Sequence, residues 1–140
     1  MKYLLDTNAV SEWVKPRPDP GLAEWLAACD EDSIYLSVVT LAELRRGIAR
    51  LELGRRRSQL DLWLRDELPQ RFDGRILPVT GAVADVWGML VAEREALGRP
   101  ISAMDAFIAA TAHLHEMVLV TRNEADFQFS LKDLLNPWLK

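Results

Sequence analysis

Short apolar runs alternate with longer amphipathic stretches along the chain, a pattern typical of strands alternating with helices. The first apolar run, Tyr3–Leu5, ends abruptly at Asp6, Thr7 and Asn8. We interpret it as a short buried strand, with Asn8 or Ser11 as the candidate N-cap of the next helix. Further strands are predicted at 33–39, 76–79 and 117–121, and the tail at 131–139 is a candidate edge strand.

Helices are predicted between these strands because apolar positions recur at helical spacing. Gly54, Pro69 and Gly98 mark three of their ends. The predicted helices are 21–30, 40–53, 56–68, 81–97 and 102–116, with an Arg-rich loop at 53–57 joining two antiparallel ones. Alternation of strands and helices implies an α/β fold, with a mostly parallel sheet covered on both faces, and residues 1–140 form one domain.

The composition is that of an ordinary globular protein, with 49% hydrophobic and 27% charged residues. No stretch approaches the roughly 20 apolar residues of a membrane span, and the N-terminus does not resemble a secretory signal. The single cysteine, Cys29, excludes an internal disulfide and fits a reducing compartment. We therefore expect a cytoplasmic protein without a membrane partner.

The net charge of −4 argues against wholesale coating of nucleic acid. Locally the balance is reversed, because six arginines lie between Arg45 and Arg57 against one acid, Glu52, which gives +5. This arginine cluster could contact phosphates or an acidic partner segment. It could equally be a solvated helix face. The sequence leaves these three interpretations open.

Three acids occupy similar places in the predicted fold. Asp6 follows the first strand directly, and Glu43 and Asp105 each lie one turn into a predicted helix. Asn123 and Asp126 follow the last buried strand, in the polar turn at 122–126. The carboxyl ends of parallel strands share one edge of a sheet, where ligands bind in open α/β folds. We therefore expect these side chains to converge on one cleft.

Each acid also has an ordinary structural explanation. In a capping box, a hydroxyl residue at the helix start pairs with an acid three residues later. Thr40 and Glu43 fit this pattern well, whereas Ser102 and Asp105 fit it less well because Asp is the shorter acid. Asp6 could be a turn residue between strand and helix, as could the polar residues after the last strand. Capping and catalysis are compatible, because Thr40 could cap a helix while Glu43 reaches towards a metal.

Clustered carboxylates repel one another and raise one another's pKa unless a cation lies between them. Oxygen ligands without histidine or cysteine suit Mg²⁺ or Mn²⁺, and phosphodiester cleavage is the natural chemistry of such a site. His113 and His115 are two residues apart on a predicted helix and point to different faces, so they do not form a metal pair. The chain has no dinucleotide-binding or P-loop glycine motif and no zinc spacing.

Four short motifs in this order resemble those of PIN domains. They are Leu-Leu-Asp-Thr-Asn at 4–8, Val-Thr-Leu-Ala-Glu-Leu-Arg-Arg-Gly at 39–47, Asp-Ala-Phe-Ile-Ala at 105–109 and Val-Thr-Arg-Asn-Glu-Ala-Asp-Phe at 120–127. More narrowly, the chain is similar to VapC/FitB-type toxins of bacterial type II toxin–antitoxin modules. The Asn-Pro-Trp sequence at 136–138 strengthens this narrower match, which covers essentially the whole chain.

The resemblance implies a three-layer α/β/α sandwich and a Mg²⁺- or Mn²⁺-dependent endoribonuclease. It also implies RNA as substrate, a homodimer, and a cognate antitoxin with a DNA-binding domain that holds the enzyme inactive. Two alternatives remain open. One is a PIN nuclease that acts on DNA or in RNA processing without an antitoxin, and the other is a catalytically silent binding module.

The same resemblance assigns roles to individual residues. Asp6, Glu43 and Asp105 match the three metal-binding acids of the family. Asn123 stands where many relatives have Asp, and Asp126 is a second candidate for this fourth position. The resemblance also implies that two hydroxyl residues orient the carboxylates or water, namely Thr7 and Thr121.

Overall fold

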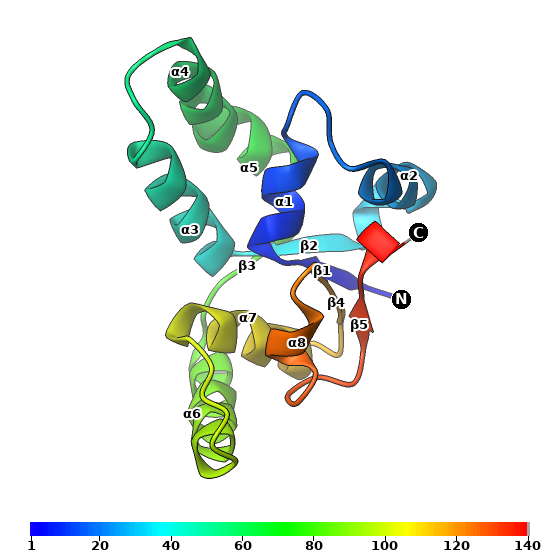
Figure 1. Ribbon diagram of the computed structural model, residues 1–140, viewed down its shortest axis with the longest axis vertical. Coiled ribbons are helices and arrows are strands. Elements are labelled where there is room, and N and C mark those ends of the chain that lie inside the picture. Colours follow the sequence, from blue (N-terminus) through cyan, green and yellow to red (C-terminus); the bar gives the residue numbers. More distant parts are fainter. Residues whose placement is uncertain (140) are drawn as a thin grey trace.

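The computed structural model describes residues 1–139 and is built around a five-stranded sheet (Figure 1). The strand order is β3-β2-β1-β4-β5, and all four strand pairings are parallel. The strands are β1 Tyr3–Leu5, β2 Ile34–Ser37, β3 Ile76–Leu77, β4 Val118–Val120 and β5 Leu134–Leu135. The predicted parallel sheet is confirmed, and the tail supplies an edge strand as expected. The first strand of the chain lies at the centre of the sheet.

Successive side chains of the central strands enter two different cores, as the period of two in a strand requires. Leu5 and Val120 belong to the core that helices α1 (Thr7–Trp13), α2 (Pro20–Ala28) and α3 (Val38–Ala49) cover. Leu4 and Leu119 belong to the core that α6 (Gly81–Ala96) and α7 (Ala103–Leu114) cover. Figure 1 shows α1 to α3, with α4 (Arg55–Leu62) and α5 (Leu68–Arg71), on one side of the sheet and α6 and α7 on the other. The three-layer α/β/α architecture is therefore confirmed.

Every predicted helix is present, although most ends differ by a few residues. The helices are α1 Thr7–Trp13, α2 Pro20–Ala28, α3 Val38–Ala49, α4 Arg55–Leu62, α5 Leu68–Arg71, α6 Gly81–Ala96, α7 Ala103–Leu114 and α8 Glu124–Phe127, with short 3-10 helices η1 Glu31–Ser33 and η3 Pro137–Leu139 and a π-helix η2 Trp63–Glu67. In the part of the chain that the structure describes, no helix is long and apolar enough to cross a membrane.

The start of α1 is a correction. Its N-cap is Asp6, whose side chain accepts a hydrogen bond from the Thr7 N–H, rather than Asn8 or Ser11. Because β1 ends at Leu5, the chain turns at once from strand to helix. Asp6 is therefore both the last residue of the turn and the first acid at this edge of the sheet.

The start of α3 is a second correction. The strand β2 is shorter than predicted, and the helix begins at Val38 with Ser37 as N-cap. The Ser37 hydroxyl accepts a hydrogen bond from the Val39 N–H at 3.0 Å. Thr40 is therefore already inside the helix, and the capping box predicted for Thr40 and Glu43 is wrong. In α7, by contrast, Ser102 is the N-cap and accepts a hydrogen bond from the Asp105 N–H.

Pro69 does not end its helix. The helix continues to Arg71 because a π turn, Trp63–Glu67, precedes the proline. In that turn the Leu68 N–H bonds to the Trp63 carbonyl, five residues back. The wider turn leaves room for the proline ring, which would clash with the preceding carbonyl in a regular α-helix.

The tail is fastened to the first half of the chain. Strand β5 pairs with β4, and the η3 turn that follows packs on α2. At this contact a Cβ on Gly21 would lie 2.4 Å from the Pro137 carbonyl oxygen. Only glycine therefore lets the two backbones come this close.

Candidate active site

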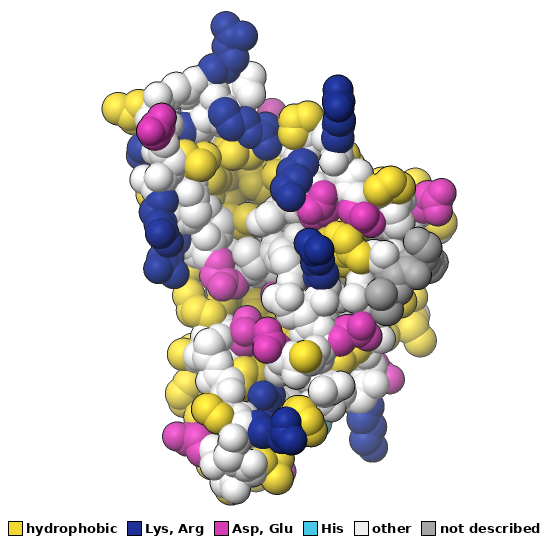
Figure 2. Space-filling view, viewed as in Figure 1, with side chains coloured by type: hydrophobic (Ala, Val, Ile, Leu, Met, Phe, Trp, Pro, Cys, Tyr) yellow, Lys and Arg dark blue, Asp and Glu magenta, His cyan; other side chains and the backbone are white. Residues whose placement is uncertain are grey.

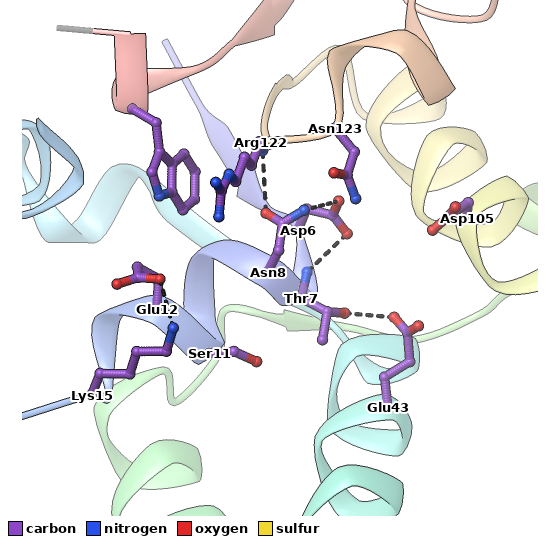
Figure 3. Close-up of a pocket in the computed structure, with 11 residues that line it drawn as sticks. Asp6, Thr7, Asn8, Ser11, Glu12, Lys15, Glu43, Asp105, Arg122 and Asn123 are labelled. Atoms are coloured by element: carbon purple, nitrogen blue, oxygen red, sulfur yellow. Dashed lines mark hydrogen bonds and ion pairs between the residues drawn. The ribbon is translucent and has the colours of Figure 1, made fainter. Parts of the chain in front are cut away.

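A pocket of about 420 Å³ opens at the carboxyl ends of β1 and β4, beside the second turn of α3 and the first turn of α7. We call it the acid pocket. Its lining residues are Asp6, Thr7, Asn8, Ser11, Glu12, Lys15, Glu43, Asp105, Arg122, Asn123 and Trp138. Figure 3 shows Asp6 between Glu43 and Asp105 on one side and Glu12, Lys15 and Arg122 on the other. The expected convergence of the three acids on one cleft is observed.

Asp6 is held by hydrogen bonds on both carboxylate oxygens. Oδ1 accepts from the Thr7 N–H at 2.8 Å, and Oδ2 accepts from the Thr121 hydroxyl at 2.8 Å and from the Asn8 amide at 3.3 Å. The backbone N–H of Asp6 donates to the Val120 carbonyl at 2.9 Å. With only 4% of its surface exposed, Asp6 is a fixed carboxylate rather than a mobile turn residue.

Glu43 is positioned by Thr7. The Thr7 hydroxyl lies 2.5 Å from Glu43 Oε1, to which it donates, and 3.2 Å from the Thr40 hydroxyl. Thr7 thus contacts both neighbouring acids, Asp6 through its backbone N–H and Glu43 through its side chain. Thr40, expected to cap α3, instead supports this contact from a fully buried position.

The two candidates for the fourth position lie in different places. Asn123 lines the acid pocket, and its N–H donates to the Thr121 hydroxyl at 3.0 Å. Asp126 lies outside the lining, in α8, and its backbone carbonyl accepts a hydrogen bond from Arg94 at 2.9 Å. Asn123 therefore lines the pocket with the three acids, whereas Asp126 stays outside the lining and acts on Asp105 only through its charge.

Burial and mutual repulsion raise the pKa values of two acids. The pKa of Asp6 is raised from 3.8 to about 6, chiefly by burial, with further contributions from the charges of Asp105 and Glu43. Hydrogen bonds, that from Thr121 above all, partly oppose this rise. The pKa of Asp105 is also raised, first by burial and then by the charges of Glu43 and Asp126. Negative charge in the acid pocket is thus held at a cost in free energy that a bound cation would relieve.

Replacing Thr121 by Val is expected to raise the pKa of Asp6 still further above 6, because the variant loses the strongest hydrogen bond to the ionised carboxylate. The measurement is an NMR titration of the aspartate side-chain carbons in chelator. Thr40→Val is the matched control, since Thr40 is equally buried but has no bond to Asp6. Equal titration of Asp6 in the two variants would contradict this assignment.

The donor set of the acid pocket fits a hard divalent cation. Its lining contains carboxylate, amide and hydroxyl oxygens but no histidine or cysteine. Within residues 1–139, no group of three or more His, Cys, Asp or Glu side chains is arranged to hold a metal ion directly. Mg²⁺ commonly keeps several waters and takes only one or two protein carboxylates. The pocket therefore suits an ion held by one or two acids, with water completing its coordination.

Sequence reasoning missed several residues of the acid pocket. Asn8 binds Asp6 and follows it by two residues, so its position at the same edge was a usable signal. Glu12 and Lys15 lie further along the same helix and form an ion pair at 3.0 Å. Arg122 and Trp138 lie in two of the motifs that carry the resemblance, but nothing local places them at the pocket, because β4 and β5 bring them there from the end of the chain.

The arginine cluster lies outside the acid pocket, on the α3–α4 hairpin. Arg45 forms an ion pair with Asp61, and Arg57 donates to the Leu51 carbonyl at 3.0 Å. Figure 2 shows acidic side chains across the middle of one face, with many Lys and Arg side chains above them. Two of the six arginines thus have partners within the chain, and the three interpretations of the cluster remain open.

Comparisons with known proteins agree with this geometry. The PIN domain family model matches residues 3–129. Toxin FitB of Neisseria gonorrhoeae is 36% identical over 135 residues, which cover 96% of this chain and 97% of the relative. The VapC ribonuclease Y4jK of Sinorhizobium fredii is also 36% identical, over 96% of each chain.

Solved structures give the same result. FitAB bound to an IR36 DNA fragment superimposes with a TM-score of 0.90 at 35% identity, covering 97% of this chain and 95% of that one. VapBC2 from Rickettsia felis, bound to a DNA fragment from its promoter, gives a TM-score of 0.79 at 25% identity, covering 97% and 98%. The family match spans β1 to β4, α1 to α8 and all three acids. On sequence, fold and site geometry together, the chain belongs to the PIN domain family.

Proposed function

We propose that this protein is a metal-dependent endoribonuclease of the toxin type, which cleaves RNA phosphodiester bonds. The observation that carries the proposal is the convergence of Asp6, Glu43 and Asp105, from three separate elements, on one pocket. Relatives that match nearly the full chain support the choice of chemistry, since they include a toxin and a VapC ribonuclease. A tRNA(fMet)-specific endonuclease VapC of Shigella flexneri, 27% identical, supports RNA as substrate.

We propose Mg²⁺, or Mn²⁺ in its place, as the cofactor, held by Asp6, Glu43 and Asp105 directly or through water. The bound ion would supply positive charge opposite the scissile phosphate and acidify a nearby water. The protein's own contribution is to hold the carboxylates in place. Thr7 and Thr121 fix two of them by hydrogen bonds and so limit their movement. Without a cation, the same carboxylates would repel an RNA phosphate.

We further propose that a cognate antitoxin holds the enzyme inactive, that the enzyme is a homodimer, and that it acts in the cytoplasm, where its RNA substrate is found. The similarity to FitB and to the FitAB and VapBC2 structures supports an antitoxin partner. The family resemblance supports the dimer.

RNA cleavage by the antitoxin-free protein tests the proposed reaction. We expect cleavage with Mg²⁺ or Mn²⁺, none in chelator, and a loss of at least about 100-fold in Glu43→Gln and in Asp105→Asn, since metal charge stabilisation is worth several kcal/mol. Glu24→Gln and Asp85→Asn are the matched controls, because both acids are exposed and lie outside the acid pocket. Cleavage that survives chelator and both pocket variants would overturn the proposed function.

A further inference from the structure

The acid pocket extends beyond the three acids. Asp6, Glu43 and Asp105 are only three of the eleven residues that line its volume of about 420 Å³. The carboxylates of Glu43 and Asp105 lie on one side of Asp6 (Figure 3). The rest of the lining includes two cations, Lys15 and Arg122, the acid Glu12, several uncharged polar side chains and one large aromatic ring, Trp138. This second part of the pocket has no role in the metal chemistry proposed above.

Arg122 is the cation in this second part that is free to bind a ligand. Lys15 is already paired with Glu12 at 3.0 Å. The exposed guanidinium of Arg122 forms no hydrogen bond or ion pair with any residue from 1 to 139, although the charge of Arg122 helps to lower the pKa of the nearby Glu12. Its backbone, by contrast, is held, because the Arg122 N–H donates to Asn8 Oδ1 at 3.3 Å. A fixed backbone with an unpaired guanidinium is suited to binding a phosphate.

Trp138 is held in the same pocket by the residues around it. The side-chain oxygen of Asn136 accepts a hydrogen bond from the backbone N–H of Trp138 at 3.0 Å. The amide of Asn136 donates to the Arg122 carbonyl at 3.5 Å and to Glu124 at 3.3 Å. One side chain thus ties the aromatic residue to the loop that carries the free arginine. The close contact of Pro137 with Gly21 fixes the turn from the other side.

We propose that Arg122 and Trp138 form a nucleotide subsite, in which a base of single-stranded RNA stacks on the Trp138 ring and an adjacent phosphate binds Arg122. The subsite rests on the proposed function, because it binds the nucleotide next to the one that is cleaved. Asn136 is a positioning residue that holds both partners. Proteins that bind single strands commonly combine an aromatic stacking surface with a positive groove. Unstacked bases are also the usual target when RNA is recognised by sequence.

The phosphate contact is tested by the salt dependence of RNA binding. The probe is a fluorescent single-stranded oligoribonucleotide that the wild type cleaves. It is bound in chelator, where the three acids repel RNA phosphates equally in every variant, and binding is followed by anisotropy. Arg122→Gln is expected to weaken binding and to make the slope of log K against log salt less negative by about 0.7, the value for one phosphate contact to a single strand. Arg17→Gln removes an exposed arginine outside the acid pocket and is expected to leave the slope unchanged.

The stacking contact is tested with abasic RNA. Trp138→Ala is expected to weaken binding of the intact oligonucleotide by about 5- to 100-fold, and Trp138→Phe is expected to recover most of the loss. In the wild type, removal of one base beside the scissile bond should cause a similar loss. In Trp138→Ala that removal should have no further effect. Phe129→Ala changes an exposed aromatic ring outside the pocket and serves as the control.

The outcomes separate the subsite from the proposed function. Suppose that the wild type cleaves RNA. An unchanged salt slope in Arg122→Gln would then overturn the subsite, as would independent effects of Trp138→Ala and base removal. Either result leaves the nuclease in place. Variants that bind RNA normally but escape inhibition by the antitoxin would assign this surface to the protein partner instead. Absence of cleavage by the wild type on every RNA would overturn the proposed function, and the subsite with it. If Trp138→Ala does not fold, Trp138→Phe and Arg122→Gln decide the question.

Discussion

Replacing Asp6 by Asn is expected to remove RNA cleavage and, at the same time, to stabilise the metal-free protein at pH 7. Activity should fall by at least about 100-fold, because the variant loses one of the carboxylates proposed to hold the cation. The helix should start normally, since Asn is as good an N-cap as Asp. A variant that is both dead and more stable would identify Asp6 as a residue kept for function at the expense of stability.

The gain in stability follows from the raised pKa of Asp6. An acid whose pKa is higher in the folded than in the unfolded state stabilises the fold at a pH below its unfolded-state pKa. This stabilisation is lost as the pH rises through the folded-state pKa. For Asp6 this window runs from 3.8 to about 6. At pH 7 the buried charge therefore costs roughly 3 kcal/mol, at 1.36 kcal/mol per pKa unit. The Asn8 amide loses its acceptor in the variant, at about 1 kcal/mol, so the expected net gain is about 1–2 kcal/mol.

Urea unfolding in chelator at pH 4 and pH 7 measures this effect. The stability difference between Asp6→Asn and wild type should be large at pH 7 and small at pH 4. Asp19→Asn is the matched control, because Asp19 is the N-cap of α2 and lies outside the acid pocket. A loss of stability at pH 7 in Asp6→Asn would contradict the expected burial cost.

Replacing Gly21 by Ala is expected to destabilise the protein by about 2–3 kcal/mol, a typical cost of overpacking. The added Cβ would lie 2.4 Å from the Pro137 carbonyl oxygen, which is backbone and has no side-chain rotation to escape the clash. The η3 turn must move away from α2 or the helix must shift. Because η3 carries Trp138, RNA binding should weaken together with stability.

Gly88→Ala is the matched control for this prediction. Gly88 lies in the middle of α6, and a Cβ there would meet nothing within 4 Å. Alanine is the better helix former by about 1 kcal/mol, so this variant should be slightly more stable than wild type. Urea unfolding of both variants measures the effect of the same substitution, glycine to alanine, at two positions. Stability should fall at Gly21 and rise slightly at Gly88. Equal effects at the two positions would show that the Pro137 contact is unimportant.

The sequence was sufficient to predict the sheet and the meeting of three acids. Periodicity identified strands and helices, and parallel strands place their carboxyl ends on one edge. Asp6 could thus be placed beside Glu43 and Asp105 without any knowledge of contacts. The helix starts were less predictable because two hydroxyl residues, Ser37 and Thr40, both stand near the start of α3. The pairing of Ser37 with Leu77 in the sheet decides where the strand ends, and no local pattern reports that pairing.

Other features depend on contacts between distant residues. Pro69 would end a regular helix, and only the π turn before it explains why the chain continues. Trp138 reaches the acid pocket because β5 pairs with β4, and Gly21 is needed because Pro137 lies against it. In each case the local sequence is ordinary, and the observed structure is explained only by the residues that it contacts in the fold.

The central position of β1 has a consequence for the timing of synthesis. Asp6 leaves the ribosome early, but the hydroxyl that fixes it belongs to Thr121, 115 residues later. One of the two strands that flank β1 is β4, Val118–Val120. An incomplete nascent chain therefore has the first acid but cannot assemble the pocket around it. The cell that makes this protein is thus shielded from its chemistry throughout most of each round of translation.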